Sequence, residues 1–191
     1  MPWTIDPAHT AITFSAKHLG VAMVRGHFTK FAGNVDIDDP NDPTTGRGRI
    51  VIDAASITTG HEQRDGHLRS PDFLDVEKYP DIVFEAKSVT PAADGGHKVT
   101  GDLTIRDVTR SITLDYEHSG VATDPYGNVK TGGTLTGIID RTAWGLRWNV
   151  PLGGGGLLVS EKIKLEIDGE IGQVKEPVAA AGGQTGTGAS A

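Results

Sequence analysis

The feature that most constrains this chain is an alternation of apolar and charged residues between positions 162 and 171, with Gly169 at one of the apolar positions. A period of two residues places the two sets on opposite faces of a β-strand. The segment therefore predicts an antiparallel strand with one buried face and one face in water. The apolar face comprises Ile163, Leu165, Ile167 and Ile171.

The same alternation recurs in shorter runs, at 12–16, 35–37, 50–52, 82–86, 103–105 and 112–116. Residues typical of turns separate these runs, among them the Pro, Asn and Asp residues of 39–43 and the glycines of 153–156. We therefore expect a succession of antiparallel strands. A β-sandwich and an up-and-down barrel both satisfy this pattern, and the alternation does not choose between them.

Two short helical segments are expected between the strands. Thr59 and Glu62 have the spacing of a capping box, which predicts a helix that begins there and ends near Arg69. A second short helical turn is expected over 18–23. Gly66 lowers the intrinsic stability of the first helix by about 1 kcal/mol relative to alanine, so tertiary contacts must support it.

Length and composition favour one domain. A chain of 191 residues with 37% hydrophobic content can bury a single sizeable core. We assign this domain to residues 1–174. The remaining residues, 175–191, consist mostly of Ala, Gly, Thr and Ser and are expected to form a disordered C-terminal tail.

The charge and the cysteine count exclude several functional classes. The formal net charge of -7 argues against nucleic acid as a partner, because nucleic-acid sites need a cationic surface. The chain has no cysteine, which excludes disulfides and thiolate chemistry. No apolar run can cross a bilayer, and no signal-like segment precedes Trp3. We expect a cytoplasmic protein, or a periplasmic or secreted one if a signal peptide was removed.

Common catalytic motifs are not found in the sequence. There is no Gly-x-Ser-x-Gly elbow, no Gly-Lys-Ser/Thr phosphate loop and no dinucleotide fingerprint after a strand. The seven histidines are scattered and give no metal-ligand spacing. We therefore assign no catalytic residues and no metal site.

Several short motifs are shared with one family. They are Arg-Asp-Gly-His-Leu at 64–68, Tyr-Pro-Asp-Ile-Val-Phe at 79–84, Gly-Asp-Leu-Thr-Ile-Arg at 101–106 and Asp-Arg-Thr-Ala-Trp-Gly at 140–145. With these motifs the chain resembles the YceI-like family of lipid-binding proteins over most of residues 2–172.

The resemblance implies an all-β fold: an eight-stranded antiparallel lipocalin-like barrel with one or two short helices. It also implies a tunnel that binds, stores or transports a polyisoprenoid or similar long-chain amphiphilic lipid. No cofactor is implied beyond that lipid ligand, and a homodimer is compatible with the family.

The resemblance and the residue types together give a candidate site. Apolar side chains are expected to line or gate the tunnel: Phe14, Phe28, Phe31, Ile57, Leu68, Phe73, Phe84 and Trp144. Side chains that donate hydrogen bonds are expected to select a polar head group, because an arginine fork matches phosphate oxygens. They are His18, Arg25, Arg64 and His67.

Two other functional classes remain open on the sequence. The chain could be an enzyme of lipid or isoprenoid metabolism that uses His67 and Asp65 as a general acid/base pair. It could also be a solid barrel that acts as an interaction or structural protein. Separately, Asp65 and Arg69 could form an ion pair that only anchors the helix to the barrel. Trp144 could close one end of the barrel or face the ligand.

Overall fold

The computed structural model describes residues 2–173, so the predicted tail at 175–191 lies outside the described residues. Within them the chain forms eleven strands, one α-helix and four short 3₁₀ turns. The strands are β1 (Pro2–Ile5), β2 (Ala11–His18), β3 (Ala22–Phe28), β4 (Phe31–Asp36), β5 (Arg47–Asp53), β6 (Ile57–Thr58), β7 (Asp81–Pro91), β8 (His97–Ile105), β9 (Val108–Thr123), β10 (Val129–Asp140) and β11 (Val159–Gln173). The helical segments are η1 (Pro7–His9), η2 (Pro43–Thr45), η3 (Ala54–Ser56), α1 (Glu62–Arg69) and η4 (Arg141–Trp144).

The last strand closes the sheet into a barrel. β11 pairs with β10 along one edge, and its other edge pairs first with β2 and then with β1. Ile167 lies opposite Ile12 in β2, and Ile171 lies opposite Ile5 in β1. β1 and β2 are therefore two halves of one strand that η1 interrupts.

The neighbouring strand is divided in the same way. β3 pairs with β2 and β4 pairs with β1, while β5, β7, β8, β9 and β10 complete the ring. With β6 counted as a two-residue extension on β3, the described chain forms a closed antiparallel barrel of eight strands. This confirms the predicted fold class. Closure also removes the unpaired strand edges that an open sheet would expose.

The side chains of β11 alternate between the inner and outer faces of the barrel, as the sequence predicts. Lys164 and Glu166 are exposed on the outer face, whereas Ile163, Leu165 and Ile167 are partly buried and pack against the hydrophobic core. A barrel of eight strands has an interior that is either filled by side chains or large enough for one small ligand. The inward residues therefore decide which of these the molecule has.

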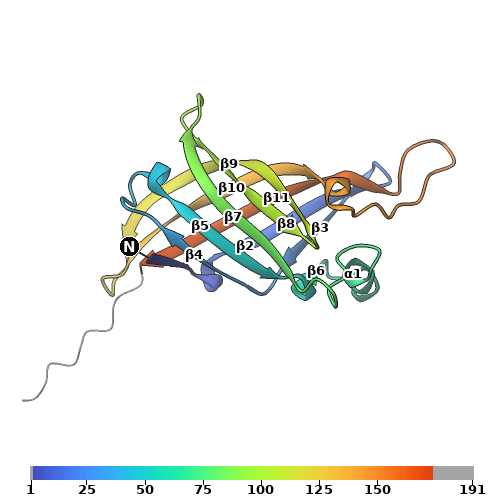
Figure 1. The fold of residues 1–191 in the computed structure, drawn as a ribbon, viewed down its shortest axis with the longest axis horizontal. Coiled ribbons are helices and arrows are strands. Elements are labelled where there is room, and N and C mark those ends of the chain that lie inside the picture. Colours follow the sequence, from blue (N-terminus) through green and yellow to red (C-terminus); the bar gives the residue numbers. More distant parts are fainter. Residues whose placement is uncertain (1, 174–191) are drawn as a thin grey trace, which may run out of the picture.

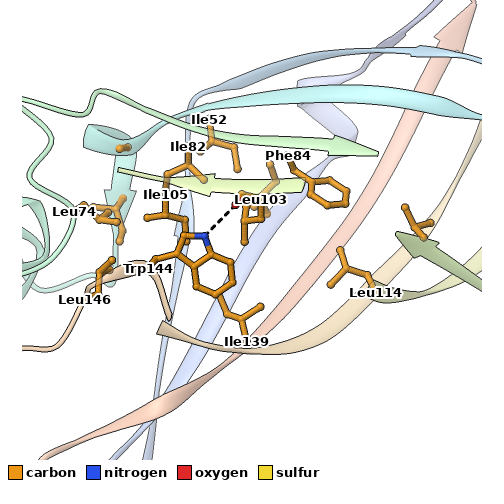
Figure 2. Close-up of a cluster of buried hydrophobic side chains, with 14 residues drawn as sticks. Ile52, Leu74, Ile82, Phe84, Leu103, Ile105, Leu114, Ile139, Trp144 and Leu146 are labelled. Carbon is orange, nitrogen blue, oxygen red and sulfur yellow. Dashed lines mark hydrogen bonds between the residues drawn. The ribbon is translucent and has the colours of Figure 1, made fainter. Parts of the chain in front are cut away.

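Trp144 fills one end of the barrel core. Figure 2 shows its indole between Ile105, Leu146 and Ile139, with Phe84 farther along the barrel. Its Nε1 donates a hydrogen bond of 3.0 Å to the Leu103 carbonyl oxygen. Of the two roles considered for Trp144, the structure favours closure of the barrel.

We expect Trp144→Phe to lower the free energy of unfolding by about 1 kcal/mol, because the carbonyl of Leu103 loses a buried donor. Urea denaturation followed by circular dichroism measures this. Trp148→Phe is the matched control, since the Trp148 indole donates to none of the described residues and should give a smaller change. Equal destabilisation by both substitutions would contradict the assignment.

Two local predictions are wrong. α1 begins at Glu62 with His61 as its N-cap, and His61 Nδ1 accepts a hydrogen bond from the Arg64 N–H. Thr59 is not the cap because its hydroxyl donates to the Asp65 carboxylate instead. Residues 18–23 form no helical turn: β2 and β3 make a hairpin there, with Leu19 and Gly20 in the left-handed region at φ 55° and 69°.

The helix and the long connection after η4 lie at the same end of the barrel. Figure 1 shows α1 and β6 at this end, while the chain begins near the opposite end. Leu19 N–H donates to the Leu158 carbonyl at 2.9 Å and joins the β2–β3 hairpin to the segment before β11. None of the helices in residues 2–173 is long and apolar enough to cross a membrane.

Candidate functional site

The barrel interior contains a cavity of about 760 Å³. Aliphatic and aromatic side chains from nearly every strand line it, including Ile12, Ile52, Leu114 and Leu165. A cavity of this volume falls in the range that binds whole small molecules. The barrel is therefore not solid, and its interior offers an apolar compartment.

A second, smaller chamber of about 150 Å³ lies farther along the barrel. Ile50, Phe84 and Ile167 line both chambers and so form the partition between them. Gly101 makes room for the Phe84 ring, because a Cβ at this position would lie 2.9 Å from Phe84 Cε2. The Phe84 ring therefore limits the depth of the larger cavity.

The α1 end of the cavity is held in place by Asp65. This carboxylate is 5% exposed and accepts hydrogen bonds from the Thr59 N–H (2.8 Å), the Thr59 hydroxyl (2.5 Å) and the Thr58 hydroxyl (3.0 Å). Burial alone would raise the pKa of Asp65, but these donors and the charge of Arg69 outweigh it and hold the pKa below its usual range. Asp65 thus ties the helix to β6.

The predicted Asp65–Arg69 ion pair is not formed in the described structure. Arg69 Nε donates to the Ala55 carbonyl at 2.8 Å, and its Nη2 donates to the Ile57 carbonyl at 2.7 Å. These carbonyls belong to η3 and β6, so both ionisable side chains attach α1 to the same neighbouring segment.

Polar side chains gather at this end of the cavity. Arg64 and Leu68 both line it, as their spacing of four residues on one helix face predicts. Arg64 Nε donates to the Thr59 hydroxyl oxygen at 2.7 Å. His18 at the end of β2 and His67 in α1 also line the cavity. The cavity is therefore polar at its α1 end and apolar in its deeper part.

His67 belongs to an aromatic cluster. Its ring stands edge-on to Trp148, with 4.5 Å between ring centroids, and lies 5.0 Å from the Phe73 ring. Its Nε2 is 2.8 Å from an oxygen of Asp72, a residue on the surface. The acid/base pair of His67 with Asp65 considered from the sequence is not present, because Asp65 is bonded to Thr58 and Thr59.

Arg141 forms a buried part of the cavity wall. It lies in η4, is 4% exposed and lines the cavity. Its Nε donates to the Ser160 carbonyl at 3.1 Å and its Nη1 to the Leu146 carbonyl at 2.5 Å, while the guanidinium carbon is 5.6 Å from the centre of the Phe73 ring. Burial lowers the pKa of Arg141, and the charges of Glu161 and Asp140 oppose this shift.

Nine of the twelve predicted site residues line the cavity. They are Phe14, Phe28, Ile57, Leu68, Phe73, Phe84, His18, Arg64 and His67. The other three do not. Phe31 is partly buried and packs against the core cluster without lining the cavity, and Trp144 is enclosed in the cluster. Arg25 is exposed, because the neighbouring Val24 faces the cavity and alternation turns Arg25 outward.

Sequence reasoning missed several lining residues. Lys17, His61 and Gln63 join the polar end of the cavity, and Trp148 joins its aromatic cluster. Trp148 lies in an irregular segment without a period of two, so alternation could not place it. Arg141 stood in a family motif, but only its burial in the fold reveals that it belongs to the wall.

One group of two carboxylates and a histidine lies outside the larger cavity. Asp6, His9 and Glu170 place their ligand atoms within 4.8 Å of one another. Lys130 Nζ already lies between the two carboxylates, at 3.0 Å from Asp6 and 2.8 Å from Glu170. A protein cation therefore offsets part of the charge of this group, and its ion pairs tie the start of η1 to β10 and β11.

Solved structures share this fold. The YCEI protein of Campylobacter jejuni has a TM-score of 0.70 and 31% identity, over 83% of this chain and 90% of that protein. A domain from Saccharophagus degradans, described as polyisoprenoid binding, has a TM-score of 0.61 at 15% identity, over 88% of this chain and 97% of that domain. At the second identity the likeness concerns the fold alone.

The sequence comparisons cover almost all of the barrel. A UPF0312 protein of Staphylococcus aureus is 39% identical over 170 residues, which is 88% of this chain and 96% of that relative. The family model of the YceI-like domain matches residues 3–171, which extend from β1 into β11, the strand that closes the barrel. This protein therefore belongs to the YceI-like family.

Proposed function

We propose that this protein binds a polyisoprenoid or similar long-chain amphiphilic lipid in the barrel cavity and stores or carries it. The observation that carries the proposal is the cavity of about 760 Å³, whose wall is mostly aliphatic and aromatic and whose α1 end is polar. An amphiphile matches this arrangement because its chain and its head group need these two environments.

Burial of the chain supplies the binding free energy. Each methylene moved from water into an apolar environment contributes about 0.8 kcal/mol. A chain of several isoprene units therefore binds tightly without a metal, a cofactor or a reaction. The Saccharophagus degradans domain described as polyisoprenoid binding has the same fold, which supports this ligand class.

The orientation of the ligand follows from the two ends of the cavity. The head group lies at the α1 end beside His18, Arg64 and His67, and the chain extends towards Phe84. These polar side chains keep the head group hydrogen-bonded. The opposite orientation would place the head group among Ile50, Phe84 and Ile167 without partners, which is costly.

The proposal is tested by titrating delipidated protein with geranylgeraniol. The neutral probe N-phenyl-1-naphthylamine is first bound in the cavity, and its fluorescence is followed as the lipid displaces it. We expect saturable displacement with one lipid per chain. Probe fluorescence that geranylgeraniol leaves unchanged would contradict a lipid-binding function.

The Phe84 partition gives a prediction on chain length. Phe84→Leu should join the two chambers in part and raise the affinity for geranylgeraniol relative to geraniol by about fourfold, the effect of roughly one more buried methylene. The displacement assay measures both ligands. Phe31→Leu makes the same change outside the cavity and should leave the ratio unaltered. An unchanged ratio in the Phe84 variant would mean that the ring does not limit depth.

A further inference from the structure

The cavity wall carries ionisable side chains of one sign only. Lys17, Arg64 and Arg141 line it together with His18, His61 and His67. Among the described residues that line the cavity, none is Asp or Glu. The whole chain has 25 acidic and 18 basic residues, so this wall has the opposite charge balance to the rest of the protein.

Arg141 is the buried member of this set. Its two hydrogen bonds go to backbone carbonyls, and they use two of the five N–H donors of a guanidinium. Nη2 is buried and donates to no acceptor in the described chain. An unpaired buried donor is unfavourable, and it is more so on a charged group.

The nearby carboxylates do not neutralise Arg141. The Asp140 carboxylate accepts from the Thr142 N–H and hydroxyl and forms an ion pair with Lys162 at 3.1 Å. Glu161 is exposed and acts on Arg141 only through its charge. Arg141 therefore places a guanidinium without a paired carboxylate in the wall of an apolar cavity.

We infer that the cavity selects amphiphiles with an anionic head group, a carboxylate or a phosphate, whose oxygens accept hydrogen bonds from Arg141. This rests on the proposed function and names the class of its ligand. The site compensates a buried cation with a ligand anion, which a neutral head group cannot do. Lys17, His18 and Arg64 add positive potential around the path from the α1 end.

The test compares ligands that share one alkyl chain. Hexadecanoate, hexadecyl phosphate and hexadecan-1-ol are each titrated into delipidated protein against bound N-phenyl-1-naphthylamine. We expect at least one anion to bind about tenfold tighter than the alcohol, because hydrogen bonds to charged groups are the stronger class. The two anionic arms separate a carboxylate from a phosphate preference. Equal affinity of all three ligands would overturn the inference and leave lipid binding intact.

Variants locate the preference at Arg141. Arg141→Met should reduce the ratio of anion affinity to alcohol affinity to near onefold, and this ratio is compared within the variant itself. Arg110→Met is the matched control, because Arg110 also donates to a backbone carbonyl of η4, that of Ala143, but does not line the cavity. A preference that survives in folded Arg141→Met would overturn the assignment to this residue.

The experiment stays decisive if Arg141→Met does not fold, because the ratio in the unaltered protein already answers the question. Displacement by none of the three ligands would contradict the proposed function and this inference with it. Displacement by the alcohol alone would contradict the inference only.

Discussion

Replacing Ile163 and Leu165 together by asparagine is expected to weaken geranylgeraniol binding by about 30-fold or more. Both side chains line the cavity from β11. Asparagine is smaller than isoleucine or leucine and so does not block the cavity, but a bound chain would strip water from two amides. Each unpaired amide costs about 1–3 kcal/mol, and about 1.4 kcal/mol is tenfold in affinity. Displacement of N-phenyl-1-naphthylamine measures the loss.

The control makes the same change on the outer face of the same strand. Lys164→Asn with Glu166→Asn removes two exposed side chains and one exposed ion pair, which contributes little to stability. This variant should bind the lipid as the unaltered protein does. Circular dichroism establishes that both variants are folded at the assay temperature. Full affinity in the inward variant would show that the lipid does not enter the barrel.

Asp65→Ala is expected to lower the free energy of unfolding by about 3 kcal/mol. The substitution removes the acceptor of three hydrogen bonds and leaves the Thr59 N–H without its partner. Because Asp65 joins α1 to β6, the α1 end of the cavity should also loosen. Urea denaturation measures the loss of stability. Asp72→Ala is the control: it removes a carboxylate that is 52% exposed and should cost less than about 1 kcal/mol.

The effect of Asp65 depends on pH in a defined direction. Its folded-state pKa is lowered, so the ionised carboxylate favours the folded state. Its contribution is complete above the unfolded pKa, about 3.9, and is lost as the pH falls through the folded value. The difference between the unaltered protein and Asp65→Ala should therefore shrink below about pH 4. A difference that grows in acid would contradict the assigned role of Asp65.

The strands and the inward faces were predictable because alternation is a property of the backbone. Ile163 and Leu165 could be placed inside from the sequence, since each strand residue points opposite to its neighbours. The same rule applied strictly to β3 would have placed Arg25 outside, because Val24 and Phe28 face the cavity. The prediction of Arg25 as a cavity residue was wrong because strand alternation was not applied to β3, although the sequence contained the information needed.

The helix start and the β2–β3 turn depended on tertiary contacts that the sequence does not display. Thr59 has the spacing of a cap, but it donates to Asp65, and His61 caps the helix instead. Closure of the ring by β11, with β1 and β2 sharing one of its edges, joins residues at opposite ends of the chain. No local sequence pattern contains such a pairing. The barrel was therefore predicted from the family resemblance, and the registers of the strand pairs were known only from the structure.

The exposure of Arg141 to a ligand was hidden for a similar reason. The sequence placed Arg141 only in a family motif, and its burial depends on η4, β11 and Phe73 meeting at one end of the barrel. A buried cation in a cavity wall is recognised only when the whole wall is known. The proposed head-group chemistry therefore rests on the structure, whereas the proposed lipid class rests on the resemblance.

Native mass spectrometry of the gently purified protein, followed by extraction and identification of any released lipid, tests the central claim most directly. We predict a stoichiometric adduct that proves to be a long-chain amphiphile, recovered chemically unaltered, and that is reduced in the Ile163→Asn, Leu165→Asn variant. Protein that is purified without a bound lipid, and that binds neither added geranylgeraniol nor hexadecanoate, would contradict the proposal that the cavity binds a lipid.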